Sequence, residues 1–282
     1  MTREQIAAAA QLACLLEASA PKPGNVSPGI AFHDTRYEDF LASAAAIAPA
    51  FLDAGTQPVG ETIRRAIDDT RRWTNANTNL GLVLLLAPLA RAAHASAPKA
   101  LRDRVREVIG ATTVSDAASV YSAIRLARPG GLGEVAEEDI AVAPTVTLAA
   151  AMELAADRDD IAHEYVTAFA RTFAVGAPAL TKARASGLDW PEAIVECYLA
   201  LLADAPDTLI ARKLGLDAAN EVRKRAADVR AVGGMRSDAG RRAVASLDLE
   251  LRDSRNSRNP GTTADITAAS VFVVLLNGGW ER

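Results

Sequence analysis

The segment of this chain best suited to bind an anion is a helix start near the C-terminus. It reads Asn259-Pro260-Gly261-Thr262-Thr263-Ala264-Asp265 and is followed by an apolar stretch. Proline is favoured at the first helical position, and the exposed N–H groups of a helix start attract phosphate. Gly261 permits close approach, and Thr262 and Thr263 add hydroxyl donors. Arg255 and Arg258 just upstream favour phosphate over the alternative, a helix that is only well capped.

Two loops near the N-terminus and one asparagine-rich segment offer further polar groups. Lys22 and Asn25 belong to a Pro/Gly loop that would display the lysine ammonium at little entropic cost. His33 and Asp34 are adjacent and could serve as a general base and as a metal or hydroxyl ligand. The segment Asn77-Thr78-Asn79 starts an apolar helix and can either cap it or present amides to a ribose or base. A solvated lysine, a hydrogen-bonded His-Asp loop and simple caps are the structural alternatives.

Charged side chains also occur in a mostly apolar segment between residues 206 and 213. Asp207, Arg212 and Lys213 need a partner or a ligand there, because burying an unpaired charge is costly. A structural ion pair and a binding site are equally compatible with this pattern. A glycine-rich turn is a further loop in which chemistry could sit, Arg128-Pro129-Gly130-Gly131-Leu132-Gly133.

Helices must position these groups. Ala is abundant, and Leu, Ile and Val recur at three- and four-residue spacing without convincing period-two alternation. We therefore predict an all-α fold, with residues 1–282 forming a single globular multi-helix domain. The predicted helices cover 3–18, 37–54, 59–73, 77–94, 99–109, 115–127, 145–173, 191–203, 217–230, 238–252 and 262–276.

Composition excludes several classes of protein. The 282 residues include 31 Lys+Arg and 35 Asp+Glu, and the formal net charge of −4 gives no field for nucleic acid or an anionic membrane. Cys14 and Cys197 are far apart and have no CxxC partner, which argues against a disulfide or a zinc site. The longest apolar run, 80–90, is too short for a bilayer, and the N-terminus lacks a signal-peptide pattern. We expect a cytoplasmic protein.

Common catalytic motifs are absent from the sequence. GxGxxG, P-loop, GxSxG and paired-histidine zinc patterns are missing, which disfavours dinucleotide enzymes, Walker-type kinases, α/β-hydrolases and zinc hydrolases. The residues by themselves indicate an all-α phosphate binder. Small apolar residues on several predicted helices are compatible with a homodimer.

Taken in chain order, the polar segments resemble those of the triphosphoribosyl-dephospho-CoA synthase family. Lys22-Pro23-Gly24-Asn25-Val26 resembles the family's Lys-Pro-Gly-x-Val, and His33-Asp34 resembles its His-x-Asp segment. Asn77-Thr78-Asn79 is similar to Asn-Thr-His. Asp207-Thr208 with Arg212-Lys213 is similar to an Asp-Thr segment ending in His-Arg, and 259–265 is similar to Pro-Gly-Gly-Ser-Ala-Asp.

The sequence departs from the family pattern at several of these positions. Asn79 and Arg212 stand where the family has histidine, Leu80 replaces a basic residue, and Thr262 replaces a second glycine. The chain is similar to a divergent branch found in archaea and methylotrophic bacteria. The fold and the donor site should therefore transfer better than the identity of the acceptor.

The resemblance implies that an acceptor hydroxyl attacks C1′ of the ribose of ATP and expels adenine, with inversion. This chemistry needs a triphosphate grip, charge stabilisation and proton transfer. The implied substrate and phosphate ligands are Lys22, Asn25, Asn77, Thr78, Asn79, Arg212, Lys213, Asn259, Gly261, Thr262 and Thr263. Mg²⁺ would bridge the phosphates through Asp34 or Asp68. The implied catalytic residues are Asp265 or His33 as base, Asp34, and Asp207 near the developing positive charge.

Three functions remain open from the sequence. The first is the transferase, with dephospho-CoA or a tetrahydromethanopterin precursor as the small-molecule acceptor. The second is an all-α hydrolase of an N-glycosidic or phosphate bond. The third is a non-catalytic nucleotide-binding subunit. The enzyme hypotheses require the polar loops to converge on one cavity.

Overall fold

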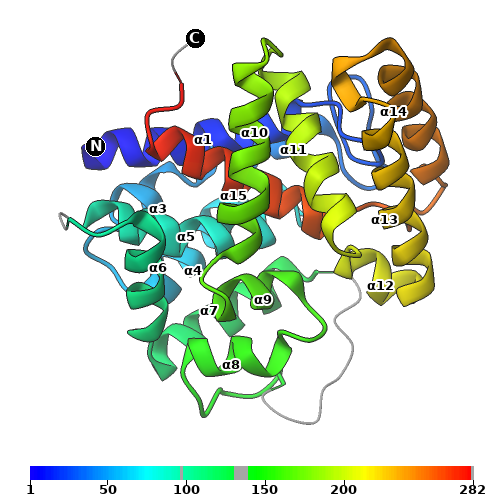
Figure 1. The fold of residues 1–282 in the computed structure, drawn as a ribbon. Coiled ribbons are helices and arrows are strands. Elements are labelled where there is room, and N and C mark those ends of the chain that lie inside the picture. The colour runs from blue at the N-terminus through cyan, green and yellow to red at the C-terminus, as the bar shows by residue number, and fades with distance from the viewer. Residues whose placement is uncertain (96–97, 130–138, 281–282) are drawn as a thin grey trace. The chain divides into compact units, whose positions relative to one another are not determined.

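The computed structural model describes residues 1–95, 98–129 and 139–280 (Figure 1). Within these residues the chain is helical, and its β-structure is limited to an isolated bridge between Ser27 and Ile30. The all-α prediction is confirmed. The chain divides into two compact units, each made of discontinuous segments: 1–14 with 38–170, and 15–37 with 171–282. We call these unit 1 and unit 2. The single domain over 1–282 stays a prediction.

Unit 1 is organised around a buried helix, α5, in which every residue from Leu82 to Ala90 is buried. Pro88 lies inside this helix and has no N–H to donate to the carbonyl of Leu84. The hydroxyl of Tyr165 donates to that carbonyl instead, at 2.7 Å. The helices of this unit are the first part of α1 (Arg3–Ser19), α2 (Tyr37–Ala46), α3 (Ala48–Leu52), α4 (Val59–Arg71), α5 (Leu80–His94), α6 (Leu101–Gly110), α7 (Val114–Ala127), α8 (Leu148–Ala155) and α9 (Asp160–Val166).

The starts of α4 and α7 are joined through one buried carboxylate. Asp116 accepts from the backbone N–H of Thr113, as part of a capping box, and its other oxygen accepts from the N–H of Gly60 at 2.8 Å. Because Gly60 has no side chain, its backbone can approach the Asp116 backbone closely. A Cβ at this position would lie 2.6 Å from the Cα of Asp116.

We expect Gly60→Ala to destabilise the protein by roughly 1–3 kcal/mol, because two helix backbones must separate to admit one methyl group. Urea denaturation followed by circular dichroism measures this loss. Gly110→Ala is the matched control, since a Cβ there meets nothing within 4 Å. Equal stability of the two variants would contradict the proposed close contact.

Unit 2 contains two strongly buried helices, α11 and α15. Every residue of α15 from Ile266 to Leu275 is buried, and Thr267 and Ser270 satisfy their hydroxyls on carbonyls one turn back. Its elements are a loop over 20–36, the π-helical turn η1 (Thr172–Gly176), α10 (Ala177–Ala185), α11 (Trp190–Asp204), α12 (Thr208–Leu214), α13 (Leu216–Ala231), the 3₁₀ turn η2 (Gly234–Arg236), α14 (Asp238–Leu251) and α15 (Gly261–Leu276). Figure 1 shows α13 beside α12 and α14, in agreement with their packing.

Two predicted helices are wrong in length, and two helices were not predicted. The prediction for 37–54 is interrupted at Ile47, between α2 and α3. The helix predicted over 145–173 is divided in the structure. Its first part, α8, ends at Ala155, and Asp159 caps the start of α9. After α9, Ala168 and Phe169 adopt positive φ. The short helices α10 and α12 were missed. Within the described ranges, no helix has the length and apolarity needed to cross a membrane.

Candidate functional site

The lysine of the N-terminal Pro/Gly loop is buried in unit 2, not displayed from its surface. Lys22 is 1% exposed, and its ammonium lies 3.0 Å from a carboxylate oxygen of Glu17. It also donates to the backbone carbonyls of Glu17 and of Ala20. Three N–H donors therefore meet three acceptors at the end of α1. The expectation that Lys22 presents a free ammonium to phosphate is wrong for this arrangement.

The same loop is fixed to α11 and α14 by polar contacts. The side-chain amide of Asn25 donates to the hydroxyl of the fully buried Tyr198 at 3.1 Å, and that hydroxyl donates to the carbonyl of Pro23 at 2.8 Å. The N–H of Gly24 donates to Asp248 at 2.8 Å. Burial raises the pKa of Tyr198 well above its ordinary value, so the phenol stays neutral. Asn25 thus positions the loop, and Tyr198 does not provide a base.

The start of α15 is closed by a carboxylate from α12. Asp207 is fully buried, and one of its oxygens caps α12 through the N–H groups of Leu209 and Ile210, at 2.9 and 3.1 Å. The other oxygen accepts from the N–H and the hydroxyl of Thr263, at 2.7 and 2.8 Å. The neighbouring Thr262 accepts from the hydroxyl of Thr208 at 3.3 Å.

These contacts engage one residue of the predicted phosphate site at this helix start, and the site as a whole stays a prediction. The N–H and hydroxyl of Thr263 point to Asp207, which occupies the place expected for an anion. These accepted hydrogen bonds position Asp207 to join two helices, and its expected place near the developing positive charge stays a prediction. A Cβ at Gly261 would lie 2.6 Å from the side chain of Leu209, so the space that this glycine leaves is occupied by the leucine.

Accessible polar groups of unit 2 gather in a surface patch made of His33, Asp34, Lys213 and Asn256, which we call the His33 patch. Nδ1 of His33 lies 3.0 Å from the side-chain amide nitrogen of Asn256, and Nε2 lies 3.7 Å from Asp34. The ammonium of Lys213 donates to the backbone carbonyl of Asn256 at 3.3 Å. Partial desolvation lowers the pKa of Lys213, while nearby carboxylates act in the opposite direction. The predicted residues His33, Asp34 and Lys213 are therefore brought together.

The loop that carries Asn256 is held in shape by its own carboxylate. Asp253 accepts from the N–H of Arg255 at 2.7 Å, and from both the N–H and the hydroxyl of Ser257. The hydroxyl of Ser257 is the main cause that lowers the pKa of Asp253 to about 2. Asn256 adopts a φ of 51°, in the left-handed region that asparagine tolerates better than most residues. The patch is thus preorganised on one side.

Three further predicted residues of unit 2 are Asn259 and Asp265, which follow this loop in the chain, and Arg212, which precedes Lys213 on α12. The side-chain oxygen of Asn259 is buried and has no hydrogen-bond partner among the residues that the structure describes. Such an orphaned acceptor is costly and suits a donor supplied by a ligand. Arg212 on α12 and Asp265 on α15 are both half-buried.

In unit 1, the Asn-Thr-Asn segment is partly a set of caps. Thr78 is buried and shares a hydrogen bond with the hydroxyl of Ser43, and Asn79 is buried and donates to Thr70 at 2.9 Å. Asn77 is exposed and accepts from the N–H of Leu80 at 3.3 Å. Of the three, only Asn77 presents its side chain to solvent. Whether the loops of the two units form one cavity stays a prediction.

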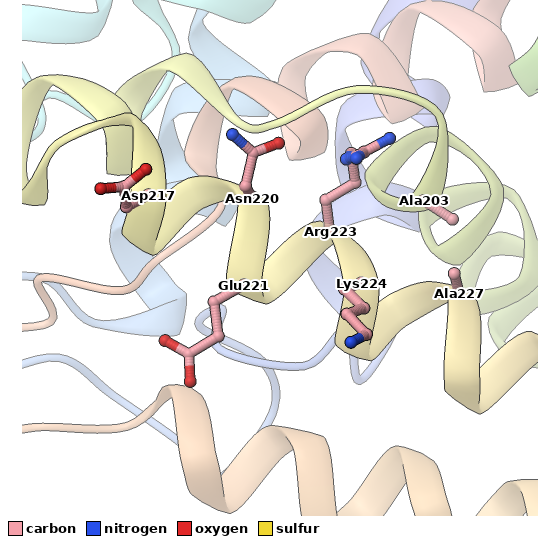
Figure 2. A pocket seen from close by; sticks show the side chains of 7 residues that line it. All are labelled: Ala203, Asp217, Asn220, Glu221, Arg223, Lys224 and Ala227. Atoms are coloured by element: carbon pink, nitrogen blue, oxygen red, sulfur yellow. The ribbon is translucent and has the colours of Figure 1, made fainter.

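The side chains that line a hollow of about 580 Å³ on α13 do not converge on one point. Figure 2 shows Asn220 and Arg223 directed to one side of the helix and Glu221 and Lys224 to the other. Glu221 is paired with Arg258 at 3.6 Å. The lining residues are Ala203, Asp217, Asn220, Glu221, Arg223, Lys224 and Ala227.

Asp34 and Asp68, the two aspartates predicted to hold Mg²⁺, are not equally suited to that role. The described residues contain no group of three or more His, Cys, Asp or Glu side chains able to hold a metal ion. Nucleotide-borne Mg²⁺ needs only one or two protein carboxylates, because phosphates and water complete its shell. The exposed Asp34 in unit 2 fits that role, whereas Asp68 in unit 1 is paired with Arg64 at 2.5 Å.

Sequence reasoning missed Glu17, Tyr198 and Asn256, and the glycine-rich turn was not tested. Glu17 precedes Lys22 by only five residues, and this short spacing was the one sign in the sequence that the two charges could pair at the end of α1. Nothing in the sequence connects Tyr198 with Asn25 or Asn256 with His33. The turn 128–133 lies outside the described residues from Gly130 onward.

Comparisons with known proteins agree with the resemblance. The model of the CitG family, described as ATP:dephospho-CoA triphosphoribosyl transferase, matches residues 3–282. A 2-(5″-triphosphoribosyl)-3′-dephosphocoenzyme-A synthase of Klebsiella pneumoniae is 33% identical over 101 residues, which are 36% of this chain and 35% of that protein. An Azotobacter vinelandii protein described as a "Probable" enzyme of this name is 35% identical over 101 residues, 36% of this chain and 34% of that protein. These matches span about a third of the curated relatives.

The structural comparison extends over most of the chain. A crystal structure of an Archaeoglobus fulgidus protein, assigned as a triphosphoribosyl-dephospho-CoA synthase, superposes with a TM-score of 0.65 at 31% identity. It covers 86% of this chain and 100% of that one. With a family model that runs almost from end to end and a solved relative of the same fold, the chain belongs to the CitG family of ATP:dephospho-CoA triphosphoribosyl transferases.

Proposed function

We propose that this protein transfers the triphosphoribosyl group of ATP to a hydroxyl of a small-molecule acceptor and releases adenine. The family model over residues 3–282 is the observation that carries the proposal. In the reaction the acceptor oxygen bonds to C1′, the bond from C1′ to the adenine nitrogen breaks, and the acceptor proton leaves its oxygen. The leaving base takes up a proton, so atoms and charge balance.

The His33 patch supplies the groups suited to this chemistry in unit 2. Lys213 offers an accessible cation, and its pKa, lowered by desolvation, would rise again beside a phosphate. His33 presents an accessible imidazole in unit 2, which would take the proton from the acceptor hydroxyl. Asp34 would hold Mg²⁺ carried by the phosphates, and the ion would supply neutralising charge when bound. Arg212 is a further proposed phosphate ligand. The side-chain oxygen of Asn259 would accept from a hydroxyl or amino group of the substrate, and Asp265 is the alternative base.

Two buried groups are proposed to act through position only. The Lys22–Glu17 pair and the Asp207–Thr263 contact fix the loops and helices that carry the accessible residues. Neither is assigned a step at the reacting atoms.

Adenine release tests the function directly. The purified protein is incubated with ATP, Mg²⁺ and either dephospho-CoA or a tetrahydromethanopterin precursor, and adenine is measured by chromatography. We expect adenine to appear only with an acceptor, and Lys213→Ala to lower kcat/KM for ATP by roughly tenfold, the effect of one lost charge-assisted contact. Lys224→Ala, which removes an exposed lysine on α13, is the matched control.

The other outcomes select the alternative functions. Adenine or phosphate formed without any acceptor would indicate the hydrolase. ATP binding with no product under any condition would indicate a nucleotide-binding subunit and would contradict the transferase.

A further inference from the structure

An exposed tryptophan stands at the start of the Asn-rich segment in unit 1. Trp73 follows α4 and is 71% exposed, more than Trp280, which is 51% exposed and stacks on Trp190. Leaving an indole in water forfeits the burial energy that makes tryptophan a core residue. We call residues 73–79 the Trp73 loop. Nothing in the preceding account of the reaction uses Trp73.

The Trp73 loop contains both buried and exposed side chains. Thr74, Thr78 and Asn79 are buried, whereas Trp73, Asn75 and Asn77 are exposed. Each buried member anchors the backbone or a neighbouring helix. A segment anchored in this way holds its outward side chains in place before any ligand arrives.

Hydrogen bonds to the last turn of α4 fix the backbone beside Trp73. The carbonyl of Thr70 accepts from the N–H of Trp73 at 2.9 Å and from the N–H of Thr74 at 3.2 Å. The hydroxyl of Thr70 accepts from Asn79 at 2.9 Å, which draws the far end of the loop to the same helix. The guanidinium of Arg71 donates to the carbonyl of Asn75. The indole is therefore carried by a short, closed loop.

The two exposed asparagines of the loop have their oxygens engaged and their NH₂ groups available. The side-chain oxygen of Asn75 accepts from Arg71 at 3.2 Å, and that of Asn77 accepts from the N–H of Leu80 at 3.3 Å. In the described part of the chain, neither NH₂ group donates to a protein acceptor. The loop thus carries two amide donors within the four positions that follow the exposed Trp73.

From this arrangement we propose that the Trp73 loop binds a purine base, which stacks on the indole and accepts hydrogen bonds from the amides of Asn75 and Asn77. A purine offers a flat π-face and ring nitrogens that accept hydrogen bonds, which matches an exposed indole and two amide donors carried by one short loop. The identity of the ligand rests on the proposed function, in which both ATP and the acceptor dephospho-CoA carry adenine. Trp73 then determines specificity for the base and takes no part in bond making.

Tryptophan fluorescence tests the inference, since the chain has three tryptophans and two of them stack on each other. The probes are ATP, dephospho-CoA and tripolyphosphate, the last lacking a base. We expect at least one adenine-bearing probe to quench the emission of Trp73 and tripolyphosphate to leave it unchanged. Which probe quenches identifies the source of the base.

Variants separate stacking from a structural role. Because these variants lack the reporter indole, their dissociation constants are measured by calorimetry. Trp73→Leu should weaken binding of the quenching probe by about tenfold, within the range for a truncated stacking aromatic, and Trp73→Phe should restore most of it. Trp280→Phe, which alters the other exposed tryptophan, should leave the dissociation constant unchanged. Should Trp73→Leu fail to fold, the fluorescence quenching of the wild-type protein and the dissociation constant of Trp73→Phe still test whether the base stacks on Trp73.

Two results would overturn the inference. One is an unchanged dissociation constant for both adenine-bearing probes in Trp73→Leu. The other is conversion of an oligomer to a monomer by Trp73→Leu with unaltered nucleotide binding, which would make the indole a contact between copies of the chain. Adenine release with normal KM values in Trp73→Leu refutes this inference alone, whereas quenching by ATP without any adenine release refutes the proposed function alone.

Discussion

Replacing Asp207 by alanine is expected to destabilise unit 2 by roughly 3–5 kcal/mol, among the largest effects of any single change in this protein. The side chain is fully buried and accepts hydrogen bonds both from the start of α12 and from Thr263 on α15. Loss of a helix cap costs about 1 kcal/mol, and each donor left unsatisfied in the interior adds about 1–3 kcal/mol before relaxation. Urea denaturation of the two proteins at neutral pH measures the difference.

Two variants separate the contributions to this loss. Asp207→Asn keeps one oxygen for the cap of α12 but places an NH₂ group against Thr263, so we expect most of the destabilisation to remain. Thr263→Val removes the hydroxyl and keeps the N–H, and should cost about 1 kcal/mol. Asp217→Ala, at an exposed position on α13, should be nearly neutral. A neutral Asp207→Ala would contradict the cap and would return Asp207 to the list of candidate catalytic groups.

The fold class was predictable from the sequence because helix periodicity is a local property. The helix of Leu80–His94 is evident in its apolar run, and a buried environment follows from its lack of a polar face. Short helices were not predictable in the same way. The seven residues of α12 complete two turns, too few for a periodic signal, although Asp207 is a good cap in front of them.

A charged run divides the helix that periodicity predicts over 145–173. Asp157-Arg158-Asp159-Asp160 is consistent with the solvated face of one long helix over 145–173. In the structure the side chain of Asp159 accepts from the N–H groups of Ile161 and Ala162, which starts a separate helix. Aspartate suits both roles, so the sequence alone does not separate them.

The candidate site was predicted by residue type but not by pairing. The polar segments do carry buried or clustered groups, as at Asp207, Thr263 and His33. Their partners are distant in sequence: Thr263 and Asp207 are 56 residues apart, and Asn256 is 223 residues from His33. One sequence does not reveal such pairs. A threonine that caps a helix for phosphate and one that meets a carboxylate look the same until the chain is folded.

Lys22→Met is the second change expected to have a large effect, with a loss of roughly 3–5 kcal/mol. The substitution removes one partner of a buried ion pair and leaves the carboxylate of Glu17 without its cation. It also removes the ammonium that donates to the carbonyls of Glu17 and Ala20 at the end of α1, although both carbonyls keep a backbone N–H donor. Thermal and urea unfolding measure the stability, and calorimetry with ATP measures binding by the folded fraction.

A double-mutant cycle separates a structural pair from a phosphate ligand. If Lys22 and Glu17 stabilise the fold through each other, Glu17→Leu combined with Lys22→Met should regain part of the loss, because no buried charge remains unpaired. Arg230→Met, at an exposed position on α13, should cost little and serves as the control for removing a cation. If Lys22→Met instead kept full stability and lost ATP affinity, the ammonium would have to leave Glu17 to meet phosphate. The pairing described here would then be one of two states of this lysine, and the loop after α1 would be a ligand-dependent element.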